Sequence, residues 1–137
     1  MCNTEETTKA KPRELNSEFL GFTGTEKYYR YSPLFPHHLT DGTKHIADKI
    51  GLYWFFDTLL SYQMYAKVKA IHFQTWTLAR VQEGKNKGRW EVILYNGKEP
   101  ILKQLFVSIM LENDYEEKFD IFTVYLADGI VFLPSEY

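Results

Sequence analysis

The sequence predicts an α+β fold in which N-terminal helices pack on a five-stranded, mainly antiparallel meander sheet. Two observations support this fold class. Between residues 40 and 67, apolar residues recur at spacings of three and four, as on the buried side of a helix. From residue 71 onward, runs rich in β-branched and aromatic residues alternate with short turns, as in antiparallel strands.

The chain is long enough for one domain. Its 137 residues can bury a core that needs no disulfide or metal for stability. Residues 1–18 are predicted to form a flexible tail because they are almost entirely polar up to residue 17. Residues 19–137 are predicted to form a single α+β domain. The single cysteine, Cys2, excludes a disulfide within one chain and a cysteine-based metal site. We expect neither a metal nor a cofactor.

The N-terminal half predicts two helices after a stretch of turns. Residues 19–39 contain glycines and prolines that favour turns and extended chain. A helix is expected to begin after Thr40 or Asp41, since either side chain can accept a bond from a first-turn N–H. Gly51 suits a left-handed C-terminal cap. Residues 52–67 predict a longer, largely buried helix, because little of its circumference is polar.

The C-terminal half predicts five strands, at residues 72–83, 89–95, 101–111, 119–127 and 130–133. Every connection is short, so successive strands are expected to pair antiparallel. Both faces of the strand at 101–111 are apolar. The sheet therefore either curls towards a barrel or meets a partner with its second face. The residues predicted to share one core are Trp54, Phe55, Leu59, Trp76, Leu105, Val107, Phe122, Val124 and Phe132.

The composition of the chain argues against several classes of function. A net charge of −2 argues against global attraction to nucleic acid or anionic lipid. Aromatic residues make up 17% of the chain, more than a core of this size requires, so some rings are expected at an interface. The apolar runs fall far short of the roughly 20 residues of a membrane helix. We expect a cytoplasmic protein that contacts no membrane.

No catalytic constellation is evident. His45 has Asp41 and Asp48 within one helical turn, but an ordinary surface interaction explains this spacing better than a functional pair. The adjacent His37 and His38 point to opposite sides of an extended chain and cannot easily share a metal. We therefore predict a protein that is not an enzyme. The alternative is a small enzyme with a scattered site.

That alternative site would use Asp57, His45 or His72.

Three other groups are better candidates for recognising a macromolecule. Tyrosine and arginine are common anchors of protein interfaces, and they also stack on single-stranded nucleic acid. A cluster of acids can attract a basic protein patch, and cations on a hairpin tip can touch phosphates. The predicted binding residues are Tyr28, Arg30 and Tyr31; Asp114, Tyr115, Glu116 and Glu117; and Lys85 and Lys87, beside Arg89.

Four stretches carry a family resemblance: residues 22–30 (FTGTEKYYR), 40–45 (TDGTKH), 53–63 (YWFFDTLLSYQ) and 133–137 (LPSEY). Together they resemble a small family of uncharacterised proteins carried on bacterial plasmids, prophages and phages. The resemblance implies an origin in a mobile genetic element. It brings no established activity and no catalytic residues.

These observations predict a non-enzymatic binding protein of a mobile element. Within that class we expect an inhibitor of a host defence nuclease complex, similar in role to an anti-CRISPR protein. Its partner would be a protein or ribonucleoprotein complex of the bacterial host, with direct nucleic-acid contact secondary. A direct binder of single-stranded nucleic acid remains an open alternative, beside the small enzyme.

Overall fold

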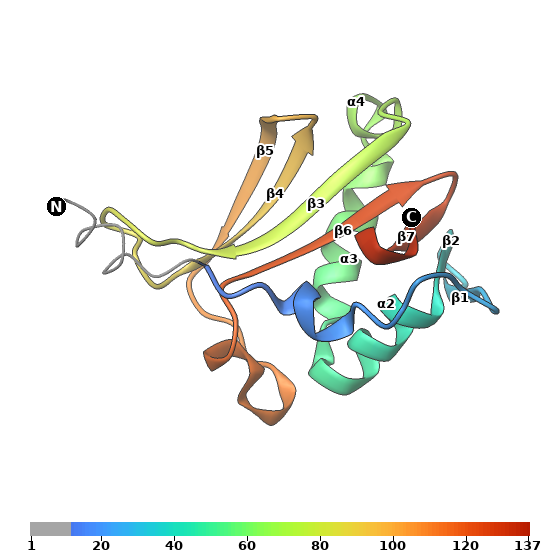
Figure 1. Ribbon diagram of the computed structural model, residues 1–137. Helices are drawn as coiled ribbons and strands as arrows, with labels where there is room; N and C mark the ends of the chain where they lie inside the picture. The colour runs from blue at the N-terminus through green and yellow to red at the C-terminus, as the bar shows by residue number, and fades with distance from the viewer. Residues whose placement is uncertain (1–11) are drawn as a thin grey trace, which may run out of the picture.

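The computed structural model describes residues 12–137, and these form one mixed sheet with helices on one face (Figure 1). Across the described residues the sheet has seven strands, in the order β1-β2-β7-β6-β3-β4-β5. The helices are α2 (Asp41–Ile46), α3 (Tyr53–Ser61) and α4 (Ala66–Lys69). The strands are β1 (Tyr29–Ser32), β2 (Phe35–Leu39), β3 (Phe73–Arg80), β4 (Trp90–Asn96), β5 (Glu99–Phe106), β6 (Ile121–Ala127) and β7 (Ile130–Phe132).

The α+β class is confirmed, but the predicted five-stranded antiparallel meander is wrong. The five expected strands correspond to β3–β7, and two further strands precede the helices. Strand β2 runs parallel to β7, with His38 opposite Ile130. Strand β6 pairs with β3 instead of β5, so the chain order is not the order in the sheet. The N-terminal half therefore contributes a hairpin to the sheet as well as helices above it.

Two prolines explain why β1 and β2 are missed. Pro33 lies in the tight turn that joins the two strands, and Pro36 lies inside β2. The His38 N–H donates to the Gly129 carbonyl, in the turn before β7, at 2.9 Å, and the Thr40 N–H donates to the Val131 carbonyl in β7 at 3.3 Å. Pro36 would be the next donor in this alternating series, but β7 does not extend that far. Because no ladder bond is lost there, the proline is tolerated in the strand.

The connection before β6 explains the altered strand order. The chain leaves β5 and passes through the 3₁₀ helix η4 (Glu112–Glu117). Within this helix Asn113 and Asp114 have φ angles of 57° and 55°, in the left-handed region. Such residues reverse a chain over a short distance, since aspartate and asparagine tolerate this conformation better than most side chains. Strand β6 consequently lies beside β3, on the opposite side from β4.

The helix boundaries are partly as predicted. The Thr40 hydroxyl accepts from the Thr43 N–H at 3.4 Å, and the Thr43 hydroxyl accepts from the Thr40 N–H at 2.8 Å, which caps α2. Gly51 has a φ of 83° and ends the following turn, as expected. The single long helix predicted for residues 52–67 is wrong, because Tyr65 adopts an extended backbone and separates α3 from α4.

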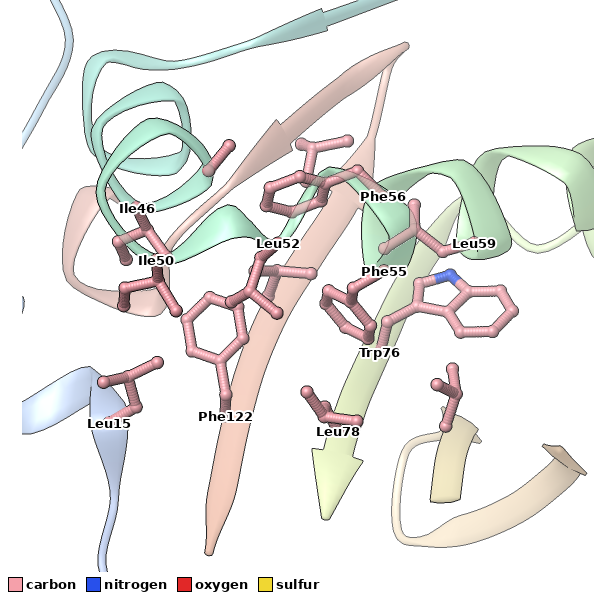
Figure 2. Close-up of a cluster of buried hydrophobic side chains, with 14 of the residues drawn as sticks. Leu15, Ile46, Ile50, Leu52, Phe55, Phe56, Leu59, Trp76, Leu78 and Phe122 are labelled. Carbon is pink, nitrogen blue, oxygen red and sulfur yellow. The ribbon is translucent and has the colours of Figure 1, made fainter. Parts of the chain in front are cut away.

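The main core lies between the helices and one face of the sheet (Figure 2). Phe55, Leu59, Trp76, Phe122 and Val124 are fully buried there, as predicted. Two other predicted core residues are exposed, Leu105 by 42% and Val107 by 71%. Leu105 lies on the sheet face without helices, in an edge strand, and Val107 follows the end of that strand. Trp54 and Phe132 are half-buried.

Residues before the expected domain start also pack against the sheet. Leu15, in the 3₁₀ helix η1 (Leu15–Phe19), is fully buried. The Asn16 side chain exchanges two hydrogen bonds of 2.8 Å with the backbone of Thr123 in β6. The Arg13 carbonyl accepts from the N–H groups of Asp120 and Ile121. The folded unit thus includes the chain from Arg13, and residues 1–11 of the expected tail lie outside the described residues.

Candidate functional site

Four aromatic rings gather on the sheet face that carries no helices. They come from β3, β6, β7 and the chain after β7. Their ring centroids lie 4.9 Å apart for Phe73 and Tyr125, and 5.7 Å apart for Tyr125 and Phe132. Tyr137 closes the group, with its centroid 5.4 Å from that of Phe73 and 5.9 Å from that of Phe132. We call these four residues the aromatic cluster.

Strand register places the rings together. Phe73 pairs with Ala127, and Tyr125 pairs with Phe132, so all three side chains project from the same face at one end of the sheet. The adjacent Val131 and Leu126 point into the main core instead. Phe73 is 39% exposed and Tyr137 is 84% exposed. Large rings left open to solvent in one patch are typical of an interaction surface.

A hollow of about 530 Å³ opens beside the aromatic cluster. Phe73, Phe132 and Tyr137 form its apolar wall. Tyr28, just before β1, lines the hollow as well and is 57% exposed. The structure thus brings one predicted recognition residue to rings that are far from it in the sequence. We call this feature the aromatic hollow.

The charged groups that line the aromatic hollow are Asp128 and Glu136, and no lysine or arginine is among the residues around it. Glu136 lies in the 3₁₀ helix η5 (Pro134–Glu136). One of its carboxylate oxygens accepts from the Thr40 hydroxyl at 2.6 Å and from the Leu133 N–H at 2.9 Å. The other accepts from the Gly42 N–H at 3.2 Å. These bonds fix a negative charge at the start of α2, where the free N–H groups favour it.

Three of the four stretches that carry the family resemblance meet at this hollow. The Asp41 N–H donates to the Thr25 hydroxyl at 2.9 Å, and the Asp41 carboxylate accepts from the Glu26 N–H at 2.8 Å. That second bond is the main reason why the pKa of Asp41 is lowered. The Ser135 hydroxyl donates to the Phe22 carbonyl at 2.6 Å. Residues 22–26, the start of α2 and η5 are therefore held as one unit.

The other two residues of the first predicted group lie apart from the hollow. The Tyr31 hydroxyl shares its one proton between the Asp57 carboxylate, at 2.6 Å, and the Tyr53 carbonyl, at 2.9 Å. Burial and the Asp57 carboxylate raise the pKa of Tyr31 well above its usual value. Tyr31 therefore fastens β1 to α3. Arg30 is exposed, and its Nε donates to the Ser32 carbonyl at 3.2 Å.

The second predicted group forms an acidic loop made of Asp114, Glu116 and Glu117. One carboxylate oxygen from each lies within 4.8 Å of the others. Tyr115, predicted to join this binding surface, is buried, with the Lys118 ammonium 4.7 Å from its ring centroid. Tyr115 is thus an anchor of η4 in the core. In Figure 1 this loop lies at the far side of the molecule from β7.

The third predicted group, Lys85 and Lys87, is exposed on the hairpin between β3 and β4. Phe73 begins β3 and Arg80 ends it, so this basic hairpin and the aromatic hollow lie at opposite ends of the strand. The three predicted groups therefore do not form one surface.

The residues named for a scattered enzyme site do not come together. The His45 ring lies 5.3 Å from the Phe22 ring and 5.8 Å from the Phe19 ring. Asp48 pairs with Lys44 at 2.8 Å and accepts a short bond from the Tyr53 hydroxyl, and the Lys44 bond is the main cause of its lowered pKa. Asp57 is engaged by Tyr31, as described above.

His72 lies elsewhere, in a pocket that it shares with His37. His38 is not among the residues lining that pocket, which agrees with the expectation that the two adjacent histidines face different sides of β2.

Within residues 12–137, no helix is long and apolar enough to cross a membrane.

No curated protein and no solved structure matches the chain. One family model does match, and it spans residues 13–137, nearly all of the sequence. The chain therefore belongs to the family of unknown function DUF6876.

Proposed function

We propose that this protein is a binding protein without catalytic turnover, and that it holds a basic segment of a partner protein in the aromatic hollow. The observation that carries the proposal is the lining of that hollow. Tyr28 and three rings of the aromatic cluster surround a space whose charged lining residues are both acids, Asp128 and Glu136.

Such a lining favours a lysine or arginine side chain. A cation over an aromatic face is stabilised by roughly 0.5–1 kcal/mol at exposed sites and by about 2 kcal/mol when desolvated. The carboxylates add attraction of the same sign. Glu136 can supply it without rearrangement, since backbone and hydroxyl donors already hold its carboxylate in place. A partner would therefore meet a preformed site.

The same charges disfavour the alternative of a direct nucleic-acid binder. Exposed tyrosines can stack on bases, but stacking proteins combine their rings with a basic groove that follows the phosphates. Here the charged lining residues are both acids, and Lys85 and Lys87 lie at the other end of β3. A protein partner with a basic patch fits this arrangement better than a phosphate backbone does.

Site-specific photo-crosslinking in cells tests this proposal. Tyr137→p-benzoylphenylalanine places the crosslinker at the hollow, and Lys87→p-benzoylphenylalanine places it on the basic hairpin as a matched control. We expect the first variant to capture one protein, at a peptide rich in lysine or arginine, and to lose the adduct when Phe132→Ser is added. Crosslinks to nucleic acid from position 87, with none to protein from position 137, would support the nucleic-acid alternative instead.

We also propose the narrower role expected from the sequence, an inhibitor of a host defence nuclease complex that serves a mobile genetic element. Its support is electrostatic. Surfaces that bind nucleic acid are basic, and both the aromatic hollow and the acidic loop present carboxylates to such a surface.

A plasmid-interference assay tests this role. In a strain whose CRISPR system rejects a targeted plasmid, the wild-type protein should restore transformation, and the Tyr28→Ala/Phe132→Ser variant should not. If the plasmid is still rejected while position 137 captures a different protein, the binding proposal stands and the inhibitor role is wrong.

A further inference from the structure

A second, separate pocket of about 610 Å³ lies on the helix-bearing side of the sheet. Its walls come from β2, the end of α3, the 3₁₀ helix η3 (Tyr62–Met64), α4, the segment before β3, and the turn between β6 and β7. The volume falls within the roughly 300–1,000 Å³ typical of small-molecule sites. Its lining residues include His37, Leu60, Gln63, Met64, Lys69 and Gln74. We call it the His37 pocket.

The pocket contains a rigid polar element. The side-chain amides of Gln63 and Gln74 exchange two hydrogen bonds, of 2.8 and 2.9 Å. Gln74 also donates to the Val68 carbonyl at 3.0 Å and accepts from the Trp76 indole N–H at 2.8 Å. Both amides are buried and satisfied within the protein. They hold the shape of the pocket and need no ligand of their own.

His37 differs from these amides. Its Nδ1 atom is buried and is the one buried side-chain nitrogen or oxygen between residues 12 and 137 that has no hydrogen-bond partner. An unpaired buried polar atom is unfavourable, so a ligand that pairs with it stabilises the bound state. Burial is the main cause of the lowered pKa of His37, and the positive charges of Lys69 and His38 lower it further. Lys69 is therefore close enough to His37 to act on it electrostatically.

The rim of the pocket is apolar. Leu34 and Met64 are almost completely exposed there, and Leu60 and Leu126 are buried at the wall. Exposed apolar side chains beside a pocket become favourable contacts when a ligand covers them. Asp128 is the carboxylate among the lining residues, and it lies in the turn between β6 and β7, across from β2.

We infer that the His37 pocket binds a small amphipathic organic anion, with its charged group at His37 and Lys69 and its apolar body against Leu34, Leu60 and Met64. With its proton on Nδ1, the neutral imidazole donates a hydrogen bond to the anion, and Lys69 supplies the opposite charge. This site goes beyond the proposed protein contact. The two features share Ala127 and Asp128 of one turn and otherwise use different residues.

Two fluorescent compounds test the inference. 8-Anilinonaphthalene-1-sulfonate is an amphipathic anion, and N-phenyl-1-naphthylamine has the same rings without the sulfonate. We expect the anion to bind the folded protein at one site. Lys69→Met and His37→Phe should each weaken it by about tenfold, the loss of one charge-assisted hydrogen bond, and should leave the neutral compound within about twofold. Met64→Ser should weaken both compounds, and Lys69→Arg should retain the anion.

The control for position is Phe132→Ser, which alters the aromatic hollow and should leave both affinities unchanged. Lys69 is exposed, so its substitution should not unfold the protein, which circular dichroism checks. The inference is overturned if Lys69→Met leaves the anion affinity unchanged, or if it weakens the two compounds equally. These results would leave the photo-crosslinking at position 137 unaffected, so the two proposals fail independently.

Discussion

Gly42 shows how one residue determines the geometry of the candidate site. A Cβ atom at this position would lie 2.7 Å from Leu133 Cδ1 and 3.0 Å from the Glu136 carboxyl group. Glycine therefore lets η5 approach the first turn of α2 closely enough for Glu136 to accept from the Gly42 N–H. The position of one wall of the aromatic hollow depends on this contact.

Gly42→Ala should destabilise the protein by about 1–3 kcal/mol, because the extra methyl group overpacks a closed contact. The helical propensity of alanine alone would stabilise α2 by up to about 1 kcal/mol. Urea denaturation separates these effects. A matched control is Gly21→Ala, since a Cβ atom there has nothing within 4 Å and should change stability little. A more stable Gly42→Ala variant would contradict the packing described here.

The ion pairs of Asp120 predict how the stability of the fold depends on pH. Its carboxylate pairs with Arg13 and Arg80, both at 3.0 Å, and the hydrogen bond from Arg13 is the main cause of its strongly lowered pKa. A carboxylate with a lowered pKa in the folded state stabilises the protein above its unfolded pKa of about 3.9. That contribution is lost as the pH falls below this value towards the folded pKa.

The urea midpoint should therefore fall between about pH 5 and pH 3, and Asp120→Asn should make this part of the curve flatter. Asp41 and Asp48, whose pKa values are also lowered, should leave some pH dependence in the variant. If the urea midpoints of the wild type and of Asp120→Asn fell equally steeply over this pH range, the two arginine contacts would not stabilise the folded state.

At the scale of elements, the two faces of the sheet should respond differently to truncation. Phe55→Ala removes a fully buried ring that contacts Phe56 and Phe122, and should cost about 3–5 kcal/mol of unfolding free energy. Leu105→Ala acts on the open face of an edge strand and should cost less than about 1 kcal/mol. Chemical denaturation of both variants checks the assignment. Equal losses would place Leu105 in a packed environment.

The elements that could be predicted from the sequence are those whose signals lie in residues close together along the chain. The Thr40 cap, the Gly51 cap and the five C-terminal strands follow from local patterns, and the structure contains each of them. The strand order could not be predicted in this way. It rests on contacts such as His38 with Ile130, between segments roughly ninety positions apart, which no local period encodes.

The candidate site could be predicted only in part from the sequence, because its residues also come from segments far apart along the chain. Tyr28 belongs to a local cluster of tyrosines and is one of the predicted binding residues. Phe132 was expected in the core, and Tyr137 had no distinguishing signal. These two rings reach Phe73 because β7 inserts between β2 and β6. Sequence reasoning missed this topology, and with it the aromatic hollow.

At the scale of the whole molecule, the surface of the described residues carries separate patches of different chemical character. The aromatic hollow lies at one end of β3 and the basic hairpin at the other, while the acidic loop follows β5. A net charge of −2 therefore conceals local patches of opposite sign. Such an arrangement orients an approaching partner, and it favours a basic protein surface at the hollow.

The central claim is that the aromatic hollow binds a cationic side chain of a protein. Titration with two fluorescently labelled peptides, acetyl-(Gly-Arg)₄-amide and its citrulline counterpart, tests it most directly, because citrulline keeps the shape of arginine and removes its charge. We expect the arginine peptide to bind at least about fivefold more tightly, and Phe132→Ser or Asp128→Asn to abolish that preference. Equal binding of the two peptides, or a preference that survives both substitutions, would contradict the account.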